Sequence, residues 1–366
     1  MEHPENDDLY KGLKVNKGVA DVPTVNPYLK KRIQRKEYTP AEFVEGILKG
    51  NITILSQAVT LVESSKYEHQ QVAQEIIEKC LPHAGKSVRI GITGVPGAGK
   101  STSIDAFGMH LIRQGRKLAV LAIDPSSERS KGSILGDKTR MEALSREKNA
   151  FIRPSPSAGS LGGVARKTRE TIVLCEAAGF DTVFVETVGV GQSETAVHSM
   201  VDFFLLIQLA GTGDELQGIK RGIMEMADGI IINKADGDNL EKAKLAAAQF
   251  RNALHLFPAP ESSWSPKVLT YSGYYNLGIK EIWDMVGEYM EFTQKNGYFN
   301  YKRNEQAKYW MYESINDTLR ETFYHNPAVE KMLNFTEQQV LNNEISSFVA
   351  AKRMMDLFLE NLSAKK

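Results

Sequence analysis

Residues 94–102 form a glycine-rich segment with the spacing G-x-x-x-x-G-K-S, the pattern of a loop that binds nucleoside triphosphates. Its glycines let the backbone turn tightly, so that amide groups face phosphate oxygens, and the helix that follows adds a partial positive charge. Lys100 would reach the β- and γ-phosphates, Ser101 would hold Mg²⁺, and Thr102 would donate to the α-phosphate. The predicted nucleotide-binding residues of this segment are Gly94, Val95, Pro96, Gly97, Ala98, Gly99, Lys100, Ser101 and Thr102.

A second pattern, Asn233-Lys-Ala-Asp236, predicts that the base is guanine. The carboxylate of Asp236 can accept hydrogen bonds from both N1–H and the 2-amino group of guanine. Adenine has no donor at either place and would leave the carboxylate unmatched, which costs free energy. Asn233 and Lys234 would support the base and brace the phosphate-binding loop. Ser272 and Gly273, which follow another apolar run, would close over the edge of the base.

Three acidic residues and one arginine are candidates for hydrolysis. Glu186 ends an apolar run and begins Glu-Thr-Val-Gly189, at a place where GTPases usually carry Asp-x-x-Gly. The carboxylate of Glu186 would hold Mg²⁺ through water, and the amide of Gly189 would sense the γ-phosphate. Asp124 and Asp137 would bind Mg²⁺-coordinated water or orient the attacking water, and Arg140 would stabilise phosphate charge. Ordinary loop chemistry is the alternative, with Asp137 capping a helix. The candidate catalytic residues are Lys100, Asp124, Asp137, Arg140 and Glu186, and the candidate Mg²⁺ ligands are Ser101, Asp124, Asp137 and Glu186.

These residues need a scaffold that brings them together. From Val88 to about Gln294 apolar runs alternate with helical patterns, which predicts an α/β fold of the P-loop NTPase type, with a mostly parallel sheet and helices on both faces. Ligands bind outside the carboxyl ends of such strands, so residues that directly follow the apolar runs should converge. The predicted strands are 88–93, 117–123, 150–153, 182–187, 202–209, 228–233 and 267–271.

Helical segments flank this region on both sides. Pro40 predicts the start of an N-terminal helix, and helical periodicity continues to about residue 81. After Gln294 we expect two or more helices, with breaks at Pro327 and at 334–336. The apolar stripe of these helices either covers its own domain or pairs with another copy of the chain. The predicted domains are a helical N-terminal extension at 1–85, the nucleotide-binding domain at 86–294 and a helical C-terminal arm at 295–366.

Composition argues against several function classes. Lys and Arg total 45, as do Asp and Glu, so no global basic field favours nucleic acid or a membrane surface. No apolar run is long enough to span a bilayer, and the acidic first residues differ from a secretory signal or a mitochondrial transit peptide. Cys80 and Cys175, each within a helical pattern, favour a reducing cytoplasm over a disulfide framework. A basic stretch at 30–36 is a solvated charged face or a local anion-binding patch.

The motifs together resemble those of the MeaB/ArgK-type G proteins. The resemblance rests on segment 94–102, Asp124-Pro-Ser-Ser127, Glu186-Thr-Val-Gly-Val-Gly-Gln-Ser-Glu194 and Asn233-Lys-Ala-Asp236. These proteins are SIMIBI-type P-loop GTPases and act as chaperones of adenosylcobalamin-dependent methylmalonyl-CoA mutase. The resemblance therefore implies a Mg²⁺-dependent GTPase, with GTP and GDP as ligands, that gates cobalamin loading and protection of this or a related acyl-CoA mutase. It also implies a homodimer formed by the C-terminal helices.

The same resemblance implies roles for three loops. Arg140 would lie in a first mobile loop, Gln192 in a second, and residues 211–220 in a third that relays the nucleotide state to the mutase. One departure from the general GTPase pattern is that Val190, and not Gln, follows Gly189. We therefore expect slow intrinsic turnover, on the order of 10⁻⁴ to 10⁻² s⁻¹, with a partner completing the site.

Three alternatives stay open. A nickel-insertion GTPase for urease or hydrogenase would commonly carry a His-rich tract or a metal-binding Cys pair, whereas the 7 His of this chain are scattered and its 2 Cys are isolated. An ATP-dependent kinase of a transport protein would leave Asp236 without a matching donor. A nucleotide-gated scaffold without useful turnover would not need Glu186 or Asp137, so substituting these two residues separates it from an enzyme.

Overall fold

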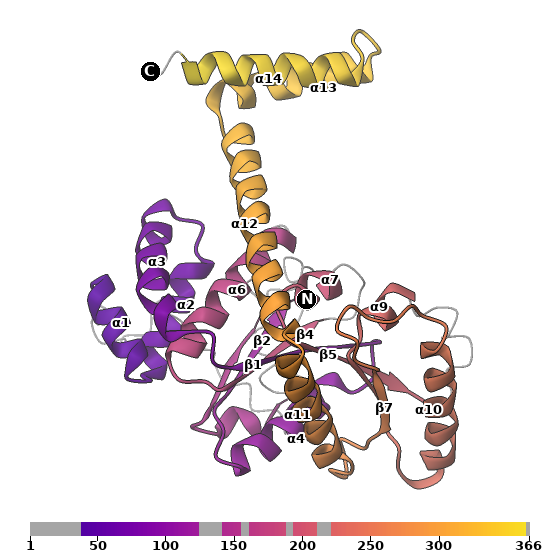
Figure 1. The fold of residues 1–366 in the computed structure, drawn as a ribbon. Helices are drawn as coiled ribbons and strands as arrows, with labels where there is room; N and C mark the ends of the chain where they lie inside the picture. Colours follow the sequence, from indigo (N-terminus) through magenta and orange to yellow (C-terminus); the bar gives the residue numbers. More distant parts are fainter. Residues whose placement is uncertain (1–37, 124–140, 155–160, 188–192, 211–220, 364–366) are drawn as a thin grey trace, which may run out of the picture. The chain divides into compact units, whose positions relative to one another are not determined.

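A seven-stranded parallel sheet forms the centre of the fold (Figure 1). The computed structural model describes residues 38–123, 141–154, 161–187, 193–210 and 221–363. The chain divides into two units, residues 1–39 and 40–366, and the sheet belongs to the second. The strand order is β3-β2-β4-β1-β5-β6-β7. The predicted strands are confirmed to within one residue at each end, as β1 Val88–Gly94, β2 Leu118–Ile123, β3 Ala150–Arg153, β4 Thr182–Thr187, β5 Phe203–Leu209, β6 Gly229–Asn233 and β7 Lys267–Thr270.

The strands form because helices bury their apolar residues on both faces of the sheet. In β6, Ile231 packs on the side of α4 (Lys100–Arg113) and α11 (Ile279–Lys295). Ile230 and Ile232 point the other way and pack on the side of α10 (Leu240–Leu254). The other α-helices that the structure describes in this region are α6 (Leu161–Ala177), α7 (Ser193–His198) and α9 (Arg221–Met226). The packed layers hold the strand ends in place, and with them the loops that carry the predicted site.

Before the sheet, the described residues form three α-helices, where the sequence predicts helical periodicity to about residue 81. They are α1 (Pro40–Leu48), α2 (Ile52–Glu63) and α3 (Tyr67–Cys80). The side chain of Asn51 caps α2 by accepting from the amides of Thr53 and Ile54 at 3.0 and 3.2 Å. Both cysteines lie in helices, are buried and are free.

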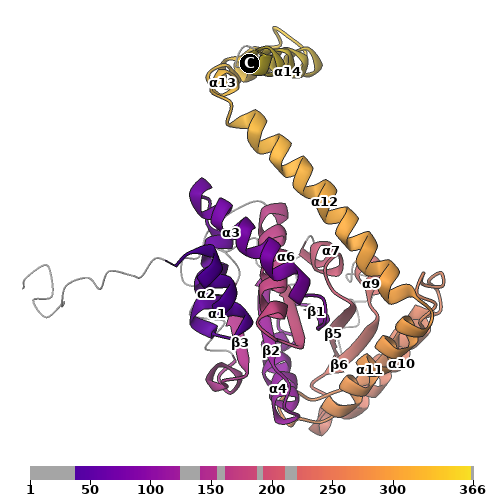
Figure 2. The same ribbon diagram turned by 60° about the vertical axis from the view of Figure 1, so that its left-hand side comes forward.

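After α11, the described chain continues in three α-helices, α12 (Tyr298–Tyr324), α13 (Pro327–Leu341) and α14 (Ser347–Ser363) (Figure 2). The predicted break at Pro327 is confirmed, because α13 begins there. The predicted break at 334–336 is wrong, because α13 runs through these residues. The hydroxyl of Thr336 donates to the carbonyl of Met332 at 2.9 Å, so this polar side chain is satisfied inside the helix. The chain reverses only after Leu341, where Asn343 has a φ of 58°. No described helix is both long and apolar enough to cross a bilayer.

A buried ion pair joins β1 to α6. Arg89 donates to the carboxylate of Glu176 through Nε at 2.8 Å and Nη2 at 2.9 Å. The Ser87 hydroxyl and the Gly85 amide donate to the same carboxylate, each at 2.6 Å. Burial would raise the pKa of Glu176, but the hydrogen bonds and the charge of Arg89 outweigh it and hold the pKa below its usual value of 4.5. Because the folded-state pKa is lowered, the carboxylate stabilises the fold above about pH 4.5, and this stabilisation is lost as the pH falls through the lowered pKa.

Replacing Glu176 by Gln is expected to lower the free energy of unfolding by about 3–5 kcal/mol at neutral pH, because Arg89 would stay buried without a counter-charge. Urea unfolding measured between neutral and acidic pH should also show a weaker pH dependence in the variant than in the wild type. Glu75→Gln is the matched control, because Glu75 pairs with Lys79 at a half-exposed site. It should change the free energy by less than about 1 kcal/mol. Equal losses in the two variants would contradict this role of the Arg89 pair.

Candidate functional site

The predicted phosphate-binding loop connects β1 to α4. In register, Ile92 of β1 lies beside Glu186 of β4 on one side and Leu205 of β5 on the other, so the loop leaves the middle of the sheet. Gly99 precedes the first residue of α4 with a φ of 84°. A Cβ at this position would meet Nδ2 of Asn233 at 2.7 Å. Glycine is therefore required here both for its backbone conformation and for the close approach of β6.

The amino group of Lys100 lies over this loop. It donates to the carbonyl oxygen of Gly94 at 2.8 Å and approaches that of Val95 at 3.4 Å. Burial lowers the pKa of Lys100, and the negative charges of Glu186 and Glu194 act in the opposite direction. A phosphate oxygen could replace these carbonyl partners and would satisfy the ammonium group with a full charge.

Ser101 and Glu186, the two predicted Mg²⁺ ligands that the structure describes, lie next to each other beside the same loop. The Ser101 hydroxyl and Oε1 of Glu186 are 3.4 Å apart. The described residues contain no group of three or more His, Cys, Asp or Glu that could hold a metal ion. A pair of oxygen ligands still suits Mg²⁺, which prefers oxygen, keeps several waters and takes further ligands from substrate phosphates. The donor set at Ser101 and Glu186 therefore fits the predicted magnesium site.

Asn233 connects the base-binding motif to the phosphate-binding loop. Its side chain is buried, and its amide donates to the carbonyl of Ala98 at 2.7 Å. Its carbonyl oxygen accepts from the amides of Lys234 at 2.7 Å and Gly273 at 3.2 Å. Lys234 has a φ of 58°, an uncommon conformation for a residue with a side chain. One side chain thus holds together three segments, the phosphate-binding loop, the end of β6 and the loop after β7.

Asp236 and Ser272, both predicted to contact the base, are hydrogen-bonded to each other. The Ser272 hydroxyl donates to Oδ2 of Asp236. The loop carrying Asp236 is fixed by backbone hydrogen bonds of 2.9 Å, from Ala235 to Tyr271 and from Tyr271 to Ile232. Ser272 in turn accepts from the amide of Tyr275 at 3.3 Å. The Ser272 hydroxyl, in the segment after β7, therefore helps to orient the carboxylate, whose oxygens have the acceptor chemistry that the predicted recognition of guanine requires.

Replacing Asn233 by Ala should lower the free energy of unfolding by about 2–4 kcal/mol, because buried groups on Ala98, Lys234 and Gly273 lose their partner. GTP affinity should fall as well, because the two halves of the site are no longer joined. Thermal or urea unfolding and nucleotide titration measure the two effects. Asn239→Ala is the control, because Asn239 is only partly buried and its side-chain amide donates to a single backbone group, the Lys234 carbonyl, at 2.7 Å. If Asn233→Ala lowered the free energy of unfolding as little as Asn239→Ala does, the result would argue against the role of Asn233 in joining the segments of the site.

The structure brings together the phosphate-binding loop, Glu186, the Asn233–Asp236 motif and the Ser272–Gly273 pair. Other predicted site residues lie outside the described residues, and their roles stay predictions: Asp124, Asp137, Arg140, Gly189, Gln192 and the segment 211–220.

The sequence patterns predict no role for Glu194. It is 1% exposed and close enough for its charge to act on Lys100. An acidic residue in the first turn of a helix is common, so its position along the chain carried no signal of burial.

Known proteins resemble this chain in sequence. Residues 55–328 match the family model described as methylmalonyl Co-A mutase-associated GTPase MeaB. The chain is 44% identical over 320 residues to the GTPase ArgK of Escherichia coli, covering 87% of this chain and 97% of that protein. It is 45% identical over 323 residues to the mitochondrial methylmalonic aciduria type A homolog of Mus musculus, and the match covers 86% of this chain and 78% of that protein. A probable GTPase of Mycobacterium tuberculosis strain H37Rv is 48% identical to this chain over 308 residues, and the match covers 84% of this chain and 92% of that protein.

A solved structure resembles the chain in fold. It is described as the crystal structure of an LAO/AO transport system kinase. Its TM-score is 0.70 and its sequence identity 38%, and the match covers 88% of this chain and 99% of that one.

Proposed function

The chain belongs to the MeaB family of methylmalonyl-CoA mutase-associated GTPases, and from that premise we propose that it is a GTP-dependent chaperone of a cobalamin-dependent acyl-CoA mutase. The chain is a GTPase with a P-loop fold. Hydrolysis of GTP would gate the loading and the protection of the cobalamin cofactor, which belongs to the client. Methylmalonyl-CoA mutase or a related enzyme would be that client. The single structural observation that supports a guanine-nucleotide switch most directly is the joining of the two nucleotide-binding motifs at Asn233.

In the proposed reaction, water attacks the γ-phosphorus of GTP. The bond from this phosphorus to the β–γ bridging oxygen breaks, GDP leaves with that oxygen, and the proton of the water passes to phosphate. Lys100 would exchange its carbonyl partner at Gly94 for a γ-phosphate oxygen and stabilise the charge that develops there. Ser101 and Glu186 would hold Mg²⁺, which when bound neutralises charge on the β- and γ-phosphate oxygens.

We propose that Asp124 and Asp137 orient water at this site and that Arg140 stabilises charge on the transferred phosphoryl group. Gly189 would sense the γ-phosphate. These assignments follow from the motif and from the strand that precedes each residue in the sequence. β2 ends at Ile123, one residue before Asp124.

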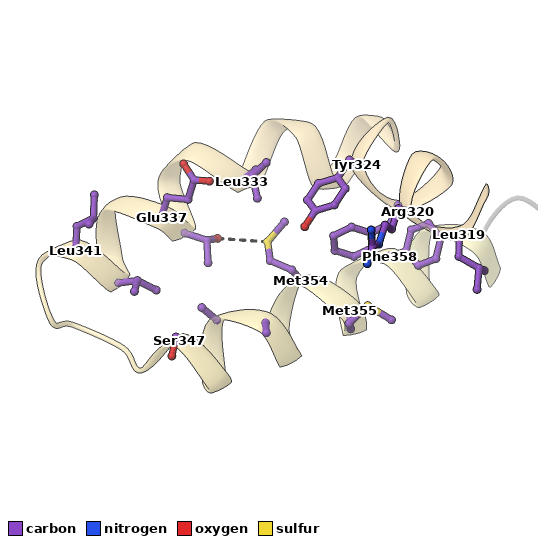
Figure 3. Close-up of a pocket in the computed structure, with 15 residues that line it drawn as sticks. Leu319, Arg320, Tyr324, Leu333, Glu337, Leu341, Ser347, Met354, Met355 and Phe358 are labelled. Carbon is purple, nitrogen blue, oxygen red and sulfur yellow. Dashed lines mark hydrogen bonds between the residues drawn. The ribbon is translucent and has the colours of Figure 1, made fainter. Parts of the chain in front are cut away.

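We further propose that helices α12 to α14 form a homodimer. Between them lies an open apolar groove of about 720 Å³ (Figure 3). Tyr324, Leu333, Met354 and Phe358 point into it, and the Thr336 hydroxyl contacts the Met354 sulfur at 3.4 Å. Large apolar side chains elsewhere on these helices are exposed, up to 86% for Phe348. An apolar surface of this kind favours burial against a protein partner, and a second copy of the chain fits the resemblance to the family.

A cofactor-loading assay tests the proposed function. Apo-methylmalonyl-CoA mutase would be mixed with this protein and adenosylcobalamin in the presence of GTP, a non-hydrolysable GTP analogue or GDP, and mutase activity followed in timed samples. We expect the loading rate to differ by about 5- to 150-fold between nucleotide states. Asp236→Asn should abolish this dependence on guanine nucleotides without removing the surfaces that face the mutase. Equal rates in all three nucleotide states, with GTP bound, would contradict the proposal.

The alternatives receive no support from the site. A carboxylate at Asp236 would match the donors of guanine and would be left unmatched by adenine, which argues against an ATP-dependent kinase of a transport protein. We propose that the protein acts in the cytoplasm.

A further inference from the structure

Two buried threonines lie at the carboxyl ends of β1 and β4, beside the phosphate-binding loop. The Thr187 hydroxyl donates to the hydroxyl oxygen of Thr93 at 2.8 Å, and each residue is 1% exposed. Thr93 directly precedes Gly94, the first residue of the loop, and Thr187 directly follows Glu186. A side-chain hydrogen bond therefore joins the start of the phosphate-binding loop to the neighbour of a predicted Mg²⁺ ligand.

This hydrogen bond lies just beyond the register pairs of the two strands. The last register pair between β1 and β4 joins Ile92 to Glu186. Thr93 and Thr187 are the next residues of their strands, so their hydroxyls continue the connection past the end of the ladder. On its other side β4 pairs with β2, where Thr187 is in register with Ile123. The end of β4 is therefore held from both sides.

The hydroxyl pair and the predicted Mg²⁺ ligand belong to opposite faces of the sheet. The Ser101 hydroxyl, in the first turn of α4, is 3.4 Å from Oε1 of Glu186. Because successive side chains of a strand alternate, Thr187 points away from α4. Thr187 can therefore act on Glu186 only through the backbone that connects them, which is the action of a positioning residue and not of a ligand.

We propose that Thr93 and Thr187 are positioning residues for the Mg²⁺ ion of the nucleotide complex. Their hydrogen bond fixes the end of β4 relative to the start of the phosphate-binding loop, and so fixes Glu186 relative to Ser101. Mg²⁺ requires near-ideal octahedral geometry, so a small displacement of one ligand weakens its binding. This inference rests on the proposed function, in which Ser101 and Glu186 hold the ion.

The test measures binding of a non-hydrolysable GTP analogue to the full-length protein over a range of Mg²⁺ concentrations. Thr187→Val keeps the shape of the side chain and removes the hydroxyl. It should raise the Mg²⁺ concentration for half-maximal tightening of analogue binding by about tenfold. With Mg²⁺ removed by EDTA, analogue affinity should stay within about twofold of the wild type, because the loop backbone and Lys100 bind the phosphates. Thr187→Ser, which keeps the hydroxyl, should match the wild type.

A double-mutant cycle and a control separate positioning from a general structural effect. Thr93→Val should shift the Mg²⁺ requirement as Thr187→Val does, and the double variant should shift it no further, because either substitution already breaks the bond. Thr293→Val is the control, because Thr293 is also buried and its hydroxyl donates to the Tyr289 carbonyl of α11 at 2.8 Å. It should leave the Mg²⁺ requirement unchanged. Thermal unfolding would verify that all variants are folded.

Glu186→Gln distinguishes a failure of this proposal from a failure of the magnesium site. It should raise the Mg²⁺ requirement by about tenfold or more, because a neutral amide replaces the charged ligand. If Glu186→Gln has this effect and Thr187→Val has none, or if the effects of Thr93→Val and Thr187→Val add, the positioning role is overturned and the magnesium site stands. An unchanged requirement in Glu186→Gln would overturn the magnesium site and the positioning role together.

Discussion

Asp236→Asn is expected to weaken GTP binding by about 10³-fold, the largest change in affinity that a single substitution in this site should produce. The wild-type carboxylate offers two acceptors to the N1–H and 2-amino donors of guanine. An amide at this position replaces one acceptor with a donor, so two donors would face each other in a buried contact. Ser272, which donates to Asp236, would keep the new side chain in the same place.

Calorimetric titration of the wild type and variant with GTP and XTP checks this expectation. Xanthine carries a carbonyl oxygen where guanine has its 2-amino group, so the amide of the variant finds a matching acceptor and XTP affinity should rise. Asp238→Asn is the control, because Asp238 is exposed and lies two residues away. Unchanged GTP affinity in Asp236→Asn, or an equal loss of affinity for GTP and XTP, would show that Asp236 does not recognise the base.

Lys100→Ala is expected to lower kcat for GTP hydrolysis by about 10³-fold. The ammonium group is the one charge of the described phosphate-binding loop that could follow the γ-phosphate into the transition state. Its hydrogen-bond acceptors in the structure are the uncharged carbonyl oxygens of Gly94 and Val95, so its removal should cost little stability.

Single-turnover hydrolysis at saturating GTP measures this effect separately from binding. Lys100→Arg should also be slow, because a planar guanidinium does not reproduce the compact ammonium of lysine. Lys280→Ala, which removes an exposed lysine of α11, should hydrolyse GTP at the wild-type rate. Hydrolysis by Lys100→Ala within tenfold of the wild type would contradict the role assigned to this residue.

The strands and the motifs could be predicted because their signals are local. A run such as Gly229–Asn233 is apolar and short and is followed by polar residues, so its burial and its end are both visible in the sequence. The same holds for the glycine loop before α4. The close approach of these motifs at one edge of the sheet could be predicted from a general rule, that ligands bind at the carboxyl ends of parallel strands.

Features that depend on contacts distant in the chain could not be predicted. Arg303 of α12 binds the carboxylate of Asp202, 101 residues earlier, and no local pattern marks either residue as a partner. The hydrogen bonds of Gln306 and Trp310 to the turn after α7 are hidden in the same way, because each looks like an ordinary helix residue until α12 is placed against that turn. The false break at 334–336 has a local cause. Asn and Thr disfavour helix interiors in general, but here the Thr336 hydroxyl is satisfied by the turn before it.

The measurement that tests the central claim most directly is the rate of GTP hydrolysis by the purified protein with and without methylmalonyl-CoA mutase, with ATP as the control nucleotide. We predict slow hydrolysis by the protein alone and a large stimulation by the mutase that occurs with GTP and not with ATP. Tight GTP binding with no stimulation by the mutase would contradict the assignment of this client. Stimulation of ATP hydrolysis to the same extent would contradict the recognition of guanine by Asp236.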